Sequence, residues 1–122
     1  MIRSSSWSSP VQRPGEVAER RARRHYRLRG YRVLGANVRA GRNELDLIVR
    51  RGRRVVFVEV KEKRGGGYGQ PLEMVDGVKR ERVRRAASAW LVSNRECAGL
   101  LVSFEAVAVQ GRRLVRVPFD VD

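Results

Sequence analysis

Two short apolar runs, residues 44–50 and 54–61, flank a glycine-containing turn and constrain the fold more than any other feature of the chain. Both runs are rich in Val, Leu and Ile, as expected of buried strands. If Gly52-Arg53 forms a two-residue loop of the Gly-X kind, Arg51 faces Arg54 across a β-hairpin. The segment therefore predicts two antiparallel strands with a fixed register.

That register brings acidic side chains together. Counting back from the turn places Asp46 opposite Glu59 and Glu44 opposite Lys61, with facing Cβ atoms roughly 4.5–5.5 Å apart. Alternate strand residues share a face. The alternation therefore places Leu45, Leu47 and Val49 on the face opposite that of Asp46. A slip of one residue would separate the two carboxylates, so the inference depends on the turn.

The remaining pattern predicts an α/β fold in which helices flank a mixed central sheet. Apolar residues at helical spacing predict helices over 16–29 and 74–93, and β-rich runs predict strands over 31–38, 100–109 and 114–117. The apolar stripe of the first helix includes Tyr26 and Leu28, and that of the second includes Val78 and Trp90. The Ser- and Pro-rich residues 1–14 predict a flexible tail, and 15–122 a single domain. The glycine-rich residues 62–71 predict a mobile or tightly turning loop.

Positive charge is the unusual part of the composition. Lys and Arg total 27 against 13 acidic residues in 122, a formal charge of +14. Such an excess points to a polyanionic partner, most commonly nucleic acid, although any single arginine can equally be a solvated surface residue. The candidate nucleic-acid contacts are Lys63, Lys79 and Arg82, the last two on the basic face of the second helix.

Several other classes of protein are disfavoured. Cys97 is the one cysteine and His25 the one histidine, so an intrachain disulfide and a cysteine-based zinc site are excluded. The same scarcity weakens a Ser/His/Asp or Cys/His hydrolase interpretation. No run approaches the roughly 18 apolar residues of a membrane span, and the first residues do not resemble a signal peptide, so we expect a cytoplasmic protein without a membrane partner.

Two carboxylates held opposite each other repel unless a cation lies between them. Mg²⁺ (or Mn²⁺) favours such oxygen ligands, with Asp46, Glu59 and the carbonyl of Val60 as candidates. Lys61 shares the face of Glu59 and could orient a water molecule or neutralise charge developing on a phosphate. Glu44 shares the face of Asp46 as a secondary acid. The alternative is a solvated sheet face with ordinary surface ion pairs.

These residues resemble a known pattern. Asp46, followed after twelve intervening residues by Glu59-Val60-Lys61, is similar to the D…(D/E)-x-K signature of restriction-endonuclease-like nucleases. More narrowly, N-E-L-D-L-I (43–48), V-F-V-E-V-K (56–61) and a later helix with Lys79 and Arg82 resemble the small bacterial YraN-type family. The resemblance covers about residues 15–117. It departs at Asn43, where the family commonly has Gly, and at Glu105, in a Ser-Phe-Glu segment where it tends to have Arg-Phe-Asp.

The resemblance implies an αβββαβ core similar to that of archaeal Holliday-junction resolvases. It implies that Asp46 and Glu59 are metal ligands, that Lys61 is the catalytic lysine, and that Glu16 reaches the site from the first helix as an accessory acid.

The leading hypothesis is a Mg²⁺-dependent endonuclease acting on branched or structured DNA. The alternatives are a non-catalytic nucleic-acid-binding module that retains the nuclease fold, and a protein partner in nucleic-acid processing. A homodimer is an open option, because resolvase-like enzymes often act as dimers.

Overall fold

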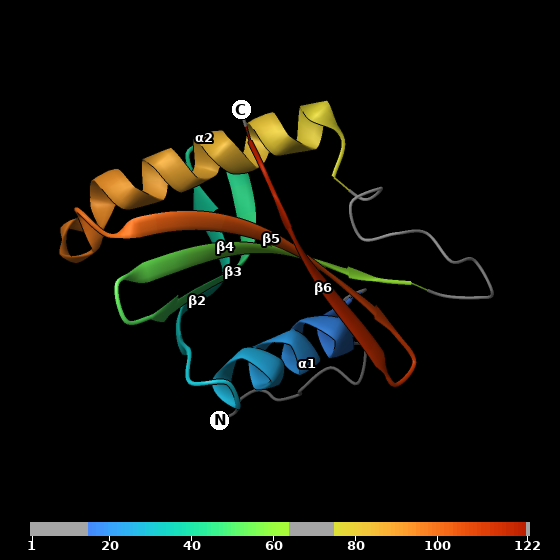
Figure 1. The fold of residues 1–122 in the computed structure, drawn as a ribbon. Helices are drawn as coiled ribbons and strands as arrows, with labels where there is room; N and C mark the ends of the chain where they lie inside the picture. Colours follow the sequence, from blue (N-terminus) through green and yellow to red (C-terminus); the bar gives the residue numbers. More distant parts are fainter. Residues whose placement is uncertain (1–14, 64–74, 122) are drawn as a thin grey trace, which may run out of the picture.

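The computed structural model describes residues 15–63 and 75–121, which form a sheet with one helix on each side (Figure 1). The expected tail (1–14) and most of the expected glycine-rich loop (62–71) lie outside the described residues. Every helix and strand expected from the sequence is present, with ends that differ by a few residues. The α/β class is confirmed, and the order of elements is consistent with a restriction-endonuclease-like core.

The sheet has five strands in the order β2-β3-β4-β5-β6. In sequence they are β2 (Arg32–Ala40), β3 (Asn43–Arg51), β4 (Arg54–Glu62), β5 (Leu101–Gln110) and β6 (Arg113–Phe119). Strands β4 and β5 pair in parallel, and the other neighbours pair antiparallel. The sheet is therefore mixed, as predicted, with α2 providing the long connection that the parallel pair needs.

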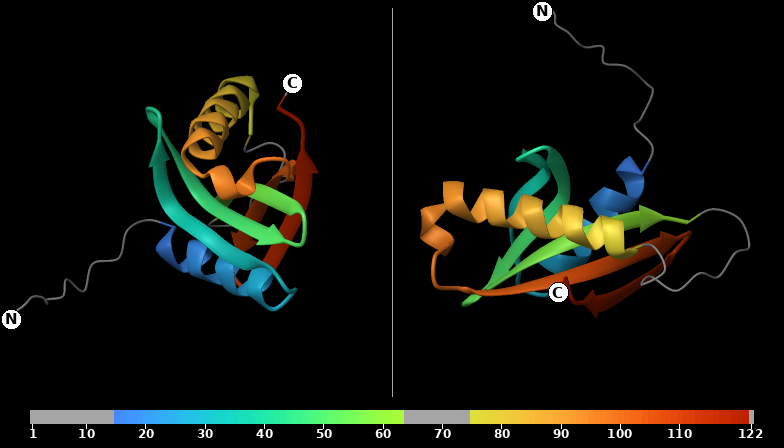
Figure 2. Two further views of the ribbon diagram at one scale, coloured as in Figure 1. Left: turned by 90° about the vertical axis from the view of Figure 1, so that its left-hand side faces the viewer. Right: turned by 90° about the horizontal axis from the view of Figure 1, so that it is seen from above.

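Each helix covers one face of the sheet (Figure 2). Helix α1 (Glu16–Arg27) buries Ala18, Ala22 and Tyr26, and α2 (Gly77–Ser93) buries Val83, Ala86, Ala87 and Trp90. A short 3-10 turn, η2 (Arg95–Cys97), follows α2. The predicted stripes were wrong at Leu28, which is 72% exposed beyond the end of α1, and at Val78, which is 63% exposed in the first turn of α2.

The sheet separates two apolar clusters. On the α2 side, Val55 and Phe57 of β4 pack with Trp90, whose ring meets that of Phe57 edge-on at 5.8 Å. On the α1 side, Val56 and Val58 pack with Tyr26. The alternation along β4 therefore matches the two-residue period of a regular strand, and it places Glu59 on the α2 side.

All three hairpins of the sheet close through a Gly-Arg pair. The turns are Gly41-Arg42, Gly52-Arg53 and Gly111-Arg112, and the three glycines have φ of 63°, 60° and 57°. Among the described non-glycine residues only Asn37 has a positive φ, so each arginine follows its glycine at negative φ. This is the two-residue arrangement predicted for Gly52-Arg53, and the facing pair Arg51–Arg54 is confirmed.

Strands β2 and β3 both change face at one point. Val38 and Leu45 pair and lie in the α2-side cluster, whereas the pair Ala36–Leu47 lies in the α1-side cluster. Regular alternation would put residues two apart on the same face. The change of face occurs at Asn37 in β2, between Ala36 and Val38, and at Asp46 in β3, between Leu45 and Leu47. Asn37 has a left-handed φ of 53°. The predicted placement of Leu45 with Leu47 was therefore wrong.

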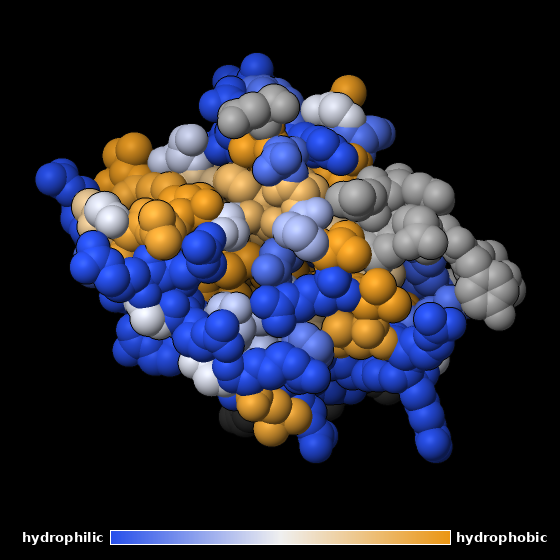
Figure 3. Space-filling view, viewed as in Figure 1, coloured by the Kyte–Doolittle hydropathy of each residue, from blue (hydrophilic) through white to orange (hydrophobic). Residues whose placement is uncertain are grey.

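Hydrophilic side chains dominate the surface in the view of Figure 3, with an apolar area over the start of β5. Leu101 and Val102 at that end of β5 are 57% and 40% exposed. Neither α1 nor α2, the two α-helices of the described residues, has the combination of length and apolarity needed to cross a membrane.

Candidate functional site

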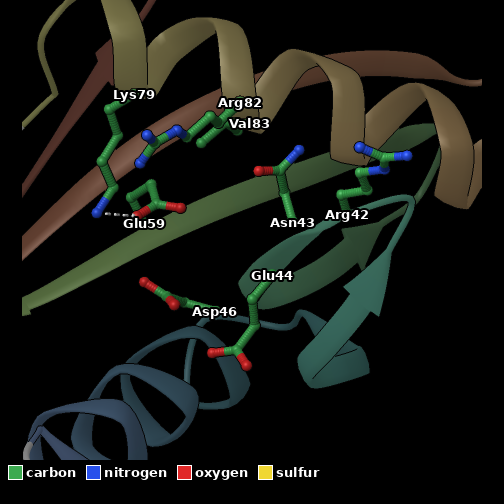
Figure 4. Close-up of a pocket in the computed structure, with 8 residues that line it drawn as sticks. All are labelled: Arg42, Asn43, Glu44, Asp46, Glu59, Lys79, Arg82 and Val83. Carbon is green, nitrogen blue, oxygen red and sulfur yellow. Dashed lines mark ion pairs between the residues drawn. The ribbon is translucent and has the colours of Figure 1, made fainter.

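The acidic residues converge on a cavity of about 320 Å³ between α2, β4 and the β2–β3 hairpin (Figure 4). The carboxylates of Asp46 and Glu59 lie at its base. The basic side chains of α2 and of the hairpin turn lie above them. The lining residues are Arg42, Asn43, Glu44, Asp46, Glu59, Lys79, Arg82 and Val83. The hairpin turn lies against α2, since a Cβ on Gly41 would be 3.7 Å from the Cβ of Ala89.

Asp46 lies where β3 and β4 part. The pairing of the two strands runs from Arg51–Arg54 to Leu47–Val58 and ends there. One residue further on, Asp46 turns its carboxylate to β4, and its Oδ2 accepts a hydrogen bond of 2.9 Å from the backbone N–H of Val60. The carboxylate thus takes the backbone donor that a continued ladder would have used.

Glu59 is the fully buried charged residue of the site, with 4% of its surface exposed. Strand β4 is paired with β5 on its other side at this point, through Glu59–Ala106. The carboxylate Oε2 lies 3.1 Å from Nζ of Lys79, in the first turn of α2. A partner of this kind is expected, because an isolated buried carboxylate is costly.

Burial raises the pKa of both carboxyl groups of the site. Burial raises the pKa of Glu59 to about 7, with the negative charge of Asp46 as the second cause, and Lys79 only partly opposes this. Burial also raises the pKa of Asp46, against the lowering effects of the Val60 N–H and of Lys79. For both acids, burial therefore outweighs the opposing effect of Lys79.

The register prediction was accurate as far as the strands pair. It brings Asp46 and Glu59 together as expected, although through a side-chain contact to the next backbone amide and not as a ladder pair. The described ladder stops before Glu44 and Lys61, so that predicted pair does not form. Glu44 lines the cavity but points its carboxylate away from Glu59, because the strand has changed face (Figure 4).

Of the remaining predicted site residues, some line the cavity and others do not. Lys61 is exposed on β4 and is absent from the described lining of the cavity, so its catalytic role stays a prediction. Glu16 begins α1 and also does not contribute to that lining. Lys63 follows β4, where its N–H donates to the carbonyl of Val109. Lys79 and Arg82 both face the cavity.

Three residues at or near the site were not singled out from the sequence. Glu19, one turn after Glu16, is the α1 acid whose negative charge raises the pKa of Asp46. Its Oε1 accepts a 3.0 Å hydrogen bond from Nδ2 of Asn37. Arg42 reaches the cavity from the β2–β3 turn. The i, i+3 spacing from Glu16 would have indicated Glu19, and the repeated Gly-Arg turn would have indicated Arg42.

The donor set fits Mg²⁺ better than a transition metal. The described residues contain no group of three or more His, Cys, Asp or Glu side chains that could hold a metal ion. Mg²⁺ usually needs only one or two carboxylates and takes its other ligands from water and phosphate. Asp46 and Glu59 could supply these carboxylates, and the backbone N–H of Val60 donates to Asp46. Two neighbouring carboxylates at the base of a polar cavity are a donor set that a divalent cation could use.

Comparison with known proteins identifies relatives along most of the chain. Residues 18–109 match the model of a family described as "Uncharacterised protein family UPF0102". A UPF0102 protein of Halorhodospira halophila is 40% identical over 114 residues, which cover 93% of this chain and 90% of the relative. One of Shewanella amazonensis is 39% identical over 101 residues (83% and 92%), and one of Moorella thermoacetica is 38% identical over 106 (87% and 88%).

Proposed function

The chain belongs to the uncharacterised protein family UPF0102, the YraN family that its motifs resemble, and from that premise we propose that it is a Mg²⁺- or Mn²⁺-dependent DNA endonuclease. The observation that carries the proposal is the buried pair Asp46 and Glu59 at the base of a cavity that basic side chains also line. The burial of two neighbouring carboxyl groups is costly, and a cation between them and a bound phosphate would offset that cost.

Each residue of the site has a part in phosphodiester hydrolysis under this proposal. Asp46 and Glu59 hold the cation, with the Val60 carbonyl as a further ligand. When bound, the cation polarises the phosphodiester and lowers the pKa of an attacking water. Arg42 and Arg82, on the two walls, hold the phosphate by charge-assisted hydrogen bonds. Lys61 and Glu44 are assigned supporting parts, Lys61 neutralising charge that develops on the phosphate.

We assign branched or structured DNA as the substrate. Arginines that contact phosphates fix the position of a protein on DNA without reading its sequence. Selectivity would then come from the shape and deformability of the DNA. The cavity lies between a helix and a hairpin turn, and an arginine from each lines it, which suits contacts to the phosphates of a DNA backbone.

The test is cleavage of linear, flapped and four-way DNA by the full chain with Mg²⁺ or Mn²⁺. We expect cleavage of flapped or four-way DNA that EDTA abolishes. Asp46→Asn should reduce it to background, and Lys61→Ala by about 100-fold. Glu96→Gln, an exposed substitution in η2, removes the same charge as Asp46→Asn outside the cavity and should retain full activity. Equal residual cleavage in the wild type and Asp46→Asn would overturn the proposal.

A non-catalytic nucleic-acid-binding module is the second candidate. It is favoured by the exposed position of Lys61 outside the cavity and by the Lys79–Glu59 ion pair, which partly neutralises the acids without a metal. This candidate expects tight, salt-sensitive binding of DNA in the same assay with no metal-dependent cleavage of any substrate.

A further inference from the structure

Lys79 has a position at the site that neither phosphate contact nor packing explains. Its backbone is held in place, because the N–H of Lys79 donates a 2.9 Å hydrogen bond to the side chain of Asp76, which caps the N-terminus of α2. From that fixed point the side chain reaches inward to the buried carboxylate of Glu59, at 3.1 Å. The side chain itself remains 44% exposed. A long, flexible side chain thus joins a fixed backbone to a buried acid and to solvent.

The charge of Lys79 acts on both carboxylates. It lowers the pKa of Asp46 as well as that of Glu59, so the ammonium favours the ionised form of each acid. Its ion pair is with Glu59 alone, since the Asp46 carboxylate accepts instead from the N–H of Val60. Lys79 therefore occupies the electrostatic role of the cation while meeting only part of the demand.

A divalent cation and the ammonium of Lys79 cannot both lie against the Glu59 carboxylate without strong repulsion. The ammonium of Lys79 is carried on a flexible four-carbon stem. The cavity of about 320 Å³ gives this side chain space to move. Near the cavity mouth it would join Arg42 and Arg82, which also line the cavity. In that position its charge would face an incoming phosphate.

We propose that Lys79 is a displaceable internal counter-ion, which pairs with Glu59 in the metal-free protein and must release it when a divalent cation binds. The inference rests on the proposed function for its metal, and it makes Lys79 a positioning residue that acts through Glu59. The ion pair holds Glu59 in place before the metal arrives, and it weakens metal affinity until a phosphate is present to receive the ammonium.

A fixed structural ion pair makes the opposite prediction. If Lys79 only held Glu59 in the orientation needed for ligation, its loss would weaken metal binding. If Lys79 competes with the metal, its loss tightens metal binding although the metal-free protein becomes less stable. The direction of the change in metal affinity therefore separates the two roles.

The experiment is calorimetric titration of the full chain with Mg²⁺, and separately with Mn²⁺, at constant ionic strength and without DNA. Lys79→Met removes the charge and retains the length of the side chain. We expect it to bind the metal about tenfold more tightly than the wild type, because close charge pairs in partly desolvated sites couple at least this strongly. Lys79→Arg retains the charge and should stay within about twofold of the wild type.

Arg82→Met is the matched control, because it removes one positive charge from the same cavity without breaking the pair with Glu59. We expect a change of no more than about threefold, the general effect of a nearby charge. An equal tightening in Arg82→Met and Lys79→Met would overturn the inference. Chemical denaturation in EDTA gives a second readout that does not depend on metal: Lys79→Met should be less stable than the wild type, and Mg²⁺ should restore the difference.

The outcomes distinguish this inference from the proposed function. If the wild type binds the metal, Asp46→Asn does not, and Lys79→Met binds no more tightly than the wild type, the counter-ion inference fails and the metal site stands. If neither the wild type nor Lys79→Met binds Mg²⁺ or Mn²⁺, the metal site of the proposed function fails, and the inference fails with it.

Discussion

At the scale of single residues, the site depends on one buried acid whose ionised form the fold disfavours. Glu59 is 4% exposed and lies beside a second carboxylate, and these two causes raise its pKa from 4.5 to about 7. Its pairing with Lys79 is too weak to reverse the effect. A residue of this kind couples protonation to stability, because the native state holds the proton more tightly than the unfolded chain does.

We therefore predict that the metal-free protein loses stability as the pH rises. The contribution of Glu59 is fully present below pH 4.5 and is lost as the pH rises through about 7, because the native state binds the extra proton over that interval. The loss is on the order of 3 kcal/mol at most. Glu59→Gln should remove most of this dependence, and Glu96→Gln should not. Denaturant unfolding in EDTA at several pH values measures it, and an unchanged pH profile in Glu59→Gln would contradict it.

Asn37 is the second residue whose conformation the site requires. It has φ of 53° where β2 changes face, and its Nδ2 donates to Glu19. We predict that Asn37→Ala costs about 1–2 kcal/mol, from the left-handed backbone and the lost hydrogen bond. Asn37→Gly loses the same hydrogen bond but tolerates the backbone angle, so it should be less destabilising by about 1 kcal/mol. Equal losses in the two variants, measured by denaturant unfolding, would show that the backbone angle is not strained.

At the scale of elements, the sequence predicted most of the fold because local signals and burial agree. The Gly-X turn fixes the register of β3 against β4, and the alternation of Val56, Phe57 and Val58 fixes the faces of β4. The change of face at Asp46 was not predictable in this way, because alternation assumes a regular strand. An asparagine within an apolar strand pattern was the one local hint, since Asn tolerates left-handed backbone better than most residues.

The contacts of the site that could not be predicted from the sequence are tertiary contacts between distant segments. Asp46 and Glu59 came from one hairpin, and their convergence could be counted residue by residue. Lys79, by contrast, meets Glu59 only because α2 packs across the sheet, and Arg42 reaches the cavity only because the β2–β3 turn rests on α2. Such contacts depend on the packing of distant segments, which periodicity along one segment does not specify.

The β3–β4 turn allows a test of how strongly this register is held. Gly52 has φ of 60°, and a Cβ placed on it would meet no atom within 4 Å, so Gly52→Ala introduces only backbone strain. We predict a loss of about 1–2 kcal/mol. Gly77→Ala is the matched control, because that glycine begins α2 in equally open space without a positive φ, and it should be neutral or stabilising by up to about 1 kcal/mol. Thermal or denaturant unfolding compares them, and a neutral Gly52→Ala would mean that the left-handed conformation at Gly52 does not disfavour alanine.

At the scale of the whole molecule, an acidic centre lies within a strongly basic protein. Under the proposed function, the net charge of +14 would draw DNA to the surface, whereas Asp46 and Glu59 would repel a phosphate at the base of the cavity unless a cation is present. Arg42 and Arg82 stand between these two regions. On the proposed function, attraction of DNA to the surface would need no metal, and only close approach of a phosphate to the two acids would need one.

We accordingly predict that DNA binds in EDTA, without cleavage, and that its affinity falls steeply with salt. Each phosphate contact contributes about 0.9 to the slope of log affinity against log salt concentration. Arg42→Gln and Arg82→Gln should each reduce that slope by about 1. Arg95→Gln removes the same charge from η2, beyond the opposite end of α2, and should leave the slope unchanged. Fluorescence anisotropy with a four-way DNA from roughly 50 to 200 mM salt measures the slopes. If Arg95→Gln reduces the slope as much as Arg82→Gln does, the positive charge acts only as a diffuse field. The DNA backbone would then not pass over the cavity.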